Sequence, residues 1–150
     1  MRIFVDTNVL FDVFAQREPF FEASQKLLVM QAFGDAELWA APQSYLDIFY
    51  VLRKGCAADE LQDALAKSLE RINLCATDHA DVLAACTGGW NDVEDALIGV
   101  AAKKVGADYL LTRDEGQPGF ARLGIPMLTP EAFFDLLRDE HDVTYDTIDL

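Results

Sequence analysis

The stretch MRIFVDTNVLFDVFAQ (Met1–Gln16) decides the fold predicted for this chain. Its first five residues, MRIFV, are mostly apolar and are typical of a short buried strand. Asp6 then interrupts the apolar run, and apolar residues recur at helical spacing from about Thr7 to Gln16. The stretch therefore predicts a buried strand that leads directly into a helix, with a carboxylate at the junction.

The same alternation of strand and helix continues along the chain. Further strands are predicted at Glu37–Ala41, Ile72–Ala76, Asp108–Thr112 and Ile125–Leu128. Further helices are predicted from Pro19 to Gly34, from Pro42 to Gly55, over about 59–70, 80–86 and 91–105, and from Thr129-Pro130 onward. This order predicts an α/β fold with a parallel sheet and helices on both faces. In such sheets the functional crevice lies beyond the carboxyl ends of the strands.

The bulk composition predicts one domain. The chain has 150 residues, of which 51% are hydrophobic, enough for a single core. Residues 139–150 carry five acids and no Lys or Arg, so they are expected to form an acidic tail that is flexible or loosely docked on a domain of residues 1–138. No apolar run is long enough to span a membrane, and three cysteines without a C-x-x-C pair favour a cytoplasmic location.

The formal net charge of −14, from 26 acids and 12 bases, argues against a broad basic face for nucleic acid. It is compatible with a protein that holds divalent cations and meets a polyanion at one local patch. It is also compatible with a basic protein partner.

Five acids are placed near the predicted functional edge of the sheet. Asp6 ends the first strand, Asp47 lies in the helix after the second strand, Asp92 and Asp95 are three residues apart on the long helix, and Asp114 follows the strand DYLLT. Each alone has an ordinary explanation as a helix cap, a first-turn acid or a turn residue. Together they would repel one another unless a cation lay among them, and oxygen ligands select Mg²⁺ or Mn²⁺. Such an ion predicts phosphodiester hydrolysis.

At this point four segments, in order, closely resemble PIN-domain proteins. They are DTNVLFDVFAQREPF (6–20), PQSYLDIFYVLRK (42–54), NDVEDALIGVAAKKVGADYLLTRD (91–114) and GIPMLTPEAF (124–133). The resemblance implies a PIN-like three-layer α/β/α sandwich with a central, mainly parallel sheet, and a Mg²⁺- or Mn²⁺-dependent ribonuclease acting on RNA. The chain also resembles the VapC-type toxins of toxin–antitoxin pairs, and this resemblance implies a homodimer that a small antitoxin neutralises.

The resemblance also assigns roles to single residues. It implies catalytic roles for Asp6, Asp47, Asp95 and Asp114, metal binding by Asp6, Asp92, Asp95 and Asp114, and supporting polar roles for Thr7, Asn8, Ser44 and Thr112. The family usually has Glu at position 47, so the shorter Asp47 is expected to reach a metal through water. The family ending T-R-N-x-x-D-F reads TRDEGQPGF here, and its Asp falls on Gly119, which leaves Asp114 as the acid available in that region.

For substrate contact, Arg113 directly follows Thr112 and is the first candidate, with Arg17 as the second. Arg53 and Lys54 are equally compatible with solvated surface charge. Trp90 either stacks on a base or packs against the rim of the sheet.

Three other readings are weighed. A haloacid-dehalogenase-like phosphatase needs an acid where Asn8 stands, and a response-regulator receiver needs an early acidic pair and a Lys where Arg113 stands. The more serious alternative is a PIN fold with a weakened site that serves as a binding or assembly module.

Overall fold

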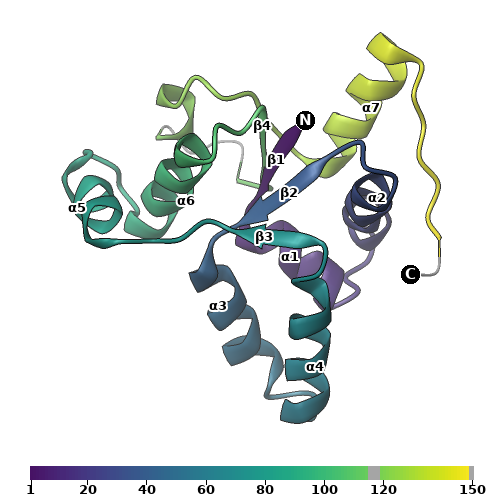
Figure 1. Ribbon diagram of the computed structural model, residues 1–150, viewed down its shortest axis with the longest axis horizontal. Helices are drawn as coiled ribbons and strands as arrows, with labels where there is room; N and C mark the ends of the chain where they lie inside the picture. Colours follow the sequence, from purple (N-terminus) through teal and green to yellow (C-terminus); the bar gives the residue numbers. More distant parts are fainter. Residues whose placement is uncertain (115–118, 149–150) are drawn as a thin grey trace.

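The computed structural model describes residues 1–114 and 119–148, and there strands and helices alternate along the chain (Figure 1). The elements are β1 (Arg2–Val5), α1 (Thr7–Phe14), α2 (Phe21–Ala32), β2 (Glu37–Ala40), α3 (Pro42–Leu52), α4 (Ala58–Ser68), β3 (Ile72–Leu74), α5 (His79–Thr87), α6 (Val93–Lys104), β4 (Tyr109–Leu111), the 3₁₀ helix η1 (Phe120–Arg122), β5 (Met127–Leu128) and α7 (Pro130–His141). The predicted order of elements is confirmed, although each strand is shorter than predicted.

The strands form one sheet in the order β3-β2-β1-β4-β5, and every strand pair is parallel. Phe4 of β1 pairs with Trp39 of β2 on one side and with Leu110 of β4 on the other. The chain leaves β1 for β2 and later returns to the opposite side of β1 with β4. The carboxyl end of β1 is therefore the switch point of the sheet, where α/β folds place their ligands. Asp6 is the first residue beyond that end.

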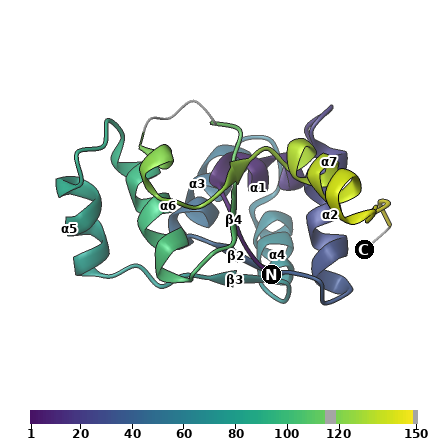
Figure 2. The ribbon, with the colours of Figure 1, turned by 90° about the horizontal axis from the view of Figure 1, so that it is seen from above.

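Side chains of the central strands alternate between two cores. On one face, Ile3 and Val5 pack in a core with residues of α1, α2, α3 and α7, such as Leu27 of α2 and Phe133 of α7. On the other face, Phe4 packs in a second core with Ile98 of α6 and Phe120 of η1. Figure 2 shows helices on both sides of the sheet, with α5 outside α6. This arrangement confirms the three-layer α/β/α sandwich.

The helix predicted over 91–105 begins later than expected. Its first helical residue is Val93, and Asp92 is its N-cap, whose side chain accepts hydrogen bonds from the N–H groups of Glu94 and Asp95 at 2.8 and 3.1 Å. The sequence predicted Asp92 and Asp95 on one face of the helix, but only Asp95 lies within the helix. An aspartate outside the first turn can satisfy two unpaired backbone N–H groups, and this fixes the start of α6.

The described part of the acidic tail docks on the domain. Residues 143–148 run back beside α2 and α7 (Figure 1). The Tyr145 hydroxyl donates to Asp35 at 2.7 Å, its ring packs on Phe134, and the Gln25 side chain donates to the Ile148 carbonyl. Residues 139–141 of the predicted tail belong to α7, and the division into a domain of residues 1–138 and a flexible or loosely docked tail stays a prediction. Residues 149–150 lie outside the described residues.

Within residues 1–114 and 119–148, no helix has both the length and the apolar content that a bilayer span needs.

Candidate active site

Asp6 is held in one orientation by the elements on either side of it. Its Oδ1 accepts from the N–H of Thr7 at 2.6 Å, so it caps the start of α1. Its Oδ2 accepts from the Thr112 hydroxyl at 2.6 Å and from the Asn8 amide at 3.3 Å. Only 4% of Asp6 is exposed. The parallel register of β1 and β4 explains this contact, because Val5 pairs with Leu111 and the residues that follow both strands meet.

The four predicted supporting residues lie in one hydrogen-bond network with Asp6. The Thr7 and Ser44 hydroxyls are 2.7 Å apart, and Ser44 is buried in the first turn of α3. The Asn8 amide donates to Asp114 at 2.9 Å, and its oxygen accepts from the backbone N–H of Arg113 at 3.1 Å. The structure brings these side chains together, while their contribution to function stays a prediction.

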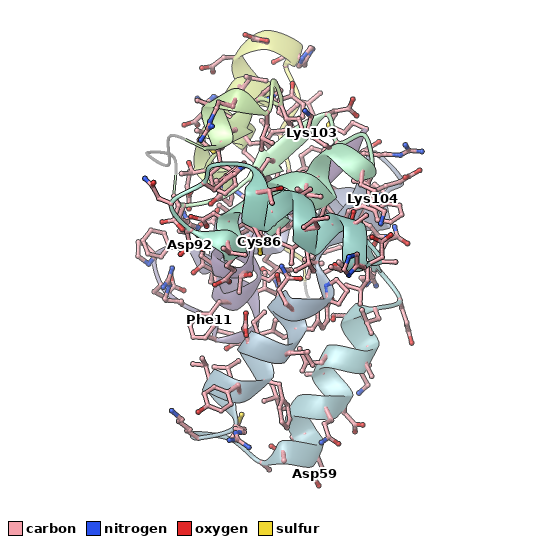
Figure 3. All side chains as sticks on the ribbon, turned by 90° about the vertical axis from the view of Figure 1, so that its left-hand side faces the viewer. Phe11, Asp59, Cys86, Asp92, Lys103 and Lys104 are labelled. Carbon is pink, nitrogen blue, oxygen red and sulfur yellow. The ribbon has the colours of Figure 1, made fainter. Side chains whose placement is uncertain are left out.

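A cavity of about 420 Å³ opens beside this network. All five predicted acids line it, together with Glu94, which the sequence analysis missed; the acids are Asp6, Asp47, Asp92, Glu94, Asp95 and Asp114. Glu94 was missed because the prediction grouped acids by the i, i+3 spacing of Asp92 and Asp95, and Glu94 lies between them in sequence, off that face. Three acids within NDVED, at a helix start near the strand ends, were the available signal. Figure 3 labels Asp92 and Phe11, two of the lining residues, which come from different elements.

The pocket carries an excess of negative charge. Burial, and then the nearby Asp92 and Asp6, raise the pKa of Asp95 to about 6. Burial raises the pKa of Asp6, with Asp114 adding repulsion, and burial followed by repulsion from Asp47 raises the pKa of Glu94. Among the described lining residues the one cation is Arg17. A further cation in the pocket would therefore relieve repulsion among these carboxylates.

The raised pKa of Asp95 predicts how the stability of the metal-free protein depends on pH. Between the ordinary value of 3.8 and about 6, the unfolded chain releases this proton while the folded chain keeps it. The folded state then binds more protons, so the free energy of unfolding falls as pH rises through this window. Urea denaturation with a chelator, at pH 4 to 7, should show this fall in the wild type and a smaller one in Asp95→Asn. Parallel pH profiles of the free energy of unfolding for wild type and Asp95→Asn would contradict a raised pKa of Asp95.

The donor set fits a hard divalent cation. Within the described parts of the chain, no three His, Cys, Asp or Glu side chains are grouped tightly enough to bind one ion directly. Mg²⁺ typically uses only one or two carboxylates and keeps several waters, which an open carboxylate pocket of this size allows. Asp6, with a fixed orientation and a buried charge, is the residue best suited to direct contact.

The two arginines proposed to contact substrate differ in their surroundings. The Arg113 guanidinium is paired with Asp12 through Nε and with Glu131 through both Nη atoms, at 2.8 and 3.1 Å, and its side chain is 13% exposed. Arg17 lines the pocket, and its side chain is 42% exposed. Arg113 is thus committed to protein partners, and its contact with substrate stays a prediction, whereas Arg17 is open to the pocket.

The position of the missing family acid is closed by Trp90. A Cβ atom on Gly119 would lie 2.2 Å from the Trp90 ring, closer than any real contact. The ring packs edge-on against Phe120, with centroids 5.3 Å apart. Packing at the rim is therefore confirmed for Trp90. Asp114 is the acid that lines the pocket on this side; residues 115–118 of the altered segment lie outside the described residues.

Restoring an acid at this position is expected to destabilise the fold. In Gly119→Asp, the new side chain must displace the Trp90 ring, and overpacking of this kind lowers the free energy of unfolding by about 1–3 kcal/mol. Gly55→Asp is the matched control, since its Cβ would meet only the Leu52 carbonyl oxygen, at 4.0 Å. Urea denaturation measures both. Equal stabilities for the two variants would show that Trp90 moves aside freely.

The fold and the pocket define a class: a parallel α/β/α domain with carboxylates gathered where its central strands end. The chain belongs to the PIN domain family, which matches residues 2–116. A search of the curated proteins found no match.

Solved structures share the fold. VapBC-1 from nontypeable Haemophilus influenzae is 15% identical, with a TM-score of 0.62 over 87% of this chain and 99% of that chain. VapBC2 from Rickettsia felis, bound to a DNA fragment from its promoter, is 15% identical, with a TM-score of 0.60 over 85% and 97%. Mycobacterium tuberculosis VapC20, a Sarcin-Ricin loop cleaving toxin, is 15% identical, with a TM-score of 0.60 over 82% and 95%. At these identities the likeness concerns the fold alone.

Proposed function

We propose that this protein is an endoribonuclease that depends on Mg²⁺ or Mn²⁺ and hydrolyses phosphodiester bonds of RNA in the carboxylate pocket. The observation that carries the proposal is Asp6, a buried carboxylate that protein hydrogen bonds orient toward five other acids at the switch point of the sheet. Membership of the PIN domain family and the likeness to VapC20, a Sarcin-Ricin loop cleaving toxin, support it.

When bound, the divalent ion lowers the pKa of a water and polarises a phosphoryl oxygen. Asp6 and Asp95 would bind it directly, and Asp92 and Asp114 through water. Asp92 already uses Oδ1 to cap α6, and Asp114 is held by the Asn8 amide at 2.9 Å. Either Asp47 or Glu94, which both line the cavity, would accept the proton that the attacking water loses. Arg17 would bind a phosphate next to the scissile one.

We further propose that the protein is the toxin of a toxin–antitoxin pair, acting in the cytoplasm as a homodimer. Two of the similar structures are VapBC proteins. Three apolar side chains of α3, Leu46, Tyr50 and Val51, are exposed, and Val51 also lines the pocket. A small antitoxin with apolar and basic residues would cover this face and meet a protein of net charge −14.

A second candidate function is a binding or assembly module with a weakened site. It is favoured by Asp47, which is one methylene shorter than the Glu usual in the family, and by the closure of position 119. The two functions differ in RNA cleavage and in metal binding. An endoribonuclease cuts a single-stranded RNA oligonucleotide only with Mg²⁺ or Mn²⁺, whereas a binding module leaves it intact under the same conditions.

A further inference from the structure

Asp12 is a fully buried carboxylate outside the pocket. It lies in the second turn of α1, is 0% exposed, and is not among the described residues that line the cavity. A buried charge is unfavourable unless it is paired. Asp12 is paired twice: its Oδ2 accepts a hydrogen bond from Nε of Arg113, and its Oδ1 lies 2.6 Å from Nη2 of Arg17, an ion pair without hydrogen-bond geometry. One carboxylate therefore joins the two arginines that border the site.

The first partner leads to the metal side of the pocket. Asp12 and Glu131 hold the Arg113 guanidinium from two helices, α1 and α7. This anchors the backbone of Arg113, whose N–H donates to Asn8 Oδ1 at 3.1 Å. With its oxygen engaged there, Asn8 turns its amide N–H groups toward Asp114 and Asp6, at 2.9 and 3.3 Å. The Asn8 contact that holds Asp114, and the longer one to Asp6, thus depend on where Arg113 is anchored, while Thr7 and Thr112 hold Asp6 as well.

The second partner leads to the substrate side. The Arg17 guanidinium carbon lies 5.0 Å from the centroid of the Phe20 ring and 5.8 Å from that of Phe11. The backbone N–H of Arg17 also donates to the Asp12 carbonyl at 3.0 Å. Two rings and one buried carboxylate therefore hold an otherwise mobile side chain at the rim of the cavity, which lowers the conformational entropy lost when it meets a phosphate.

We propose that Asp12 is a positioning residue that sets both halves of the site from outside it: the metal-side carboxylates through Arg113 and Asn8, and the phosphate-binding cation through Arg17. The proposal rests on the metal-dependent RNA cleavage proposed above and adds a specific consequence. Substitution of Arg17 should disturb the phosphate-binding half alone, substitution of Glu131 the metal half alone, and substitution of Asp12 both halves.

The test combines Mn²⁺ calorimetry with RNA cleavage kinetics on the full chain. Asp12→Asn should weaken Mn²⁺ binding roughly 10-fold, the lower end of what outer-shell substitutions produce, and should also raise KM. Arg17→Gln should raise KM without weakening Mn²⁺ binding, because it removes a positive charge from the pocket. Glu131→Gln should weaken Mn²⁺ binding and leave KM unchanged. Asp63→Asn, an exposed aspartate of α4, is the matched control and should change neither.

The outcomes separate the proposals. If folded Asp12→Asn keeps the wild-type Mn²⁺ affinity and KM and loses only thermal stability, Asp12 is merely structural and the inference is wrong. If Asp12→Asn does not fold, the other two variants test the inference. A change in KM for Arg17→Gln and weaker Mn²⁺ binding for Glu131→Gln support it, and identical or absent effects overturn it. A wild-type protein that binds no Mn²⁺, or whose binding survives Asp6→Asn, instead refutes the proposed function.

Discussion

Asp6→Asn is expected to abolish Mn²⁺ binding and to lower the rate of RNA cleavage by more than about 100-fold, because loss of a ligand exceeds the 10–100-fold effect of an outer-shell change. The substitution keeps the size of the side chain and its capacity to cap α1, since Asn and Asp are equivalent at N-caps. It removes the charge that the proposed cation requires, and it replaces the Oδ2 that accepts from Thr112 and Asn8 with an amide NH2 group. Among the six acids of the pocket, only Asp6 is buried, and the other five are partly or largely exposed.

The same substitution should leave the fold intact. Burial raises the pKa of Asp6, which means that its charged form is disfavoured in the metal-free protein. Removing that charge relieves this penalty and offsets the loss of the acceptor for Thr112 and Asn8, so the metal-free melting temperature of Asp6→Asn should stay close to that of the wild type. A less active but equally stable variant is the signature of a functional carboxylate rather than a structural one.

The measurement is cleavage of a single-stranded RNA oligonucleotide with Mg²⁺ or Mn²⁺, alongside calorimetry with Mn²⁺ and circular dichroism. Asp63→Asn serves as the control for removal of a carboxylate elsewhere. Equal cleavage by wild type and Asp6→Asn would refute the site. Tight Mn²⁺ binding without any cleavage by the wild type would favour the binding-module alternative.

The features predicted correctly from the sequence depend on local pattern. Apolar runs and helical spacing define the strands and helices, and the parallel order then brings together acids that follow strands or open helices, such as Asp6 and Asp114. The missed Glu94 lies in the first turn of α6, next to Asp95 and off the i, i+3 face on which the prediction was based. The cavity reaches around this first turn, and the width of a cavity depends on tertiary packing that the local pattern does not define.

The features that could not be predicted depend on tertiary packing. Arg113 was placed at the substrate because it follows Thr112, yet its partner Asp12 is 101 residues away in sequence. Likewise, nothing in the letters TRDEGQPGF shows that the Trp90 ring fills the space beside Gly119. A side chain's neighbours across the fold, rather than its position in a motif, decide whether it is free to meet a ligand.

Arg113→Met should lower the free energy of unfolding by about 3–5 kcal/mol, the usual effect of breaking a buried ion pair. Met keeps only the aliphatic part of the side chain, and the guanidinium, whose Cζ lies 4.1 Å from the centroid of the Phe20 ring, is lost, so the fall combines the broken ion pairs with the lost cation–π contact. Asp12 would remain at 0% exposure with only the partly exposed Arg17 as partner. Arg138→Met is the control, because its ion pairs with Asp135 and Asp139 are exposed; exposed pairs contribute little.

A double-mutant cycle isolates the pair. In Asp12→Asn/Arg113→Met the buried negative charge is gone as well, so Arg113→Met should be less destabilising in the Asp12→Asn background than in the wild type. Urea denaturation of the four proteins gives the coupling free energy. Strictly additive losses would mean that Arg113 stabilises the fold through its contact with Glu131 and its packing over Phe20, and that Asp12 is neutralised by Arg17 alone.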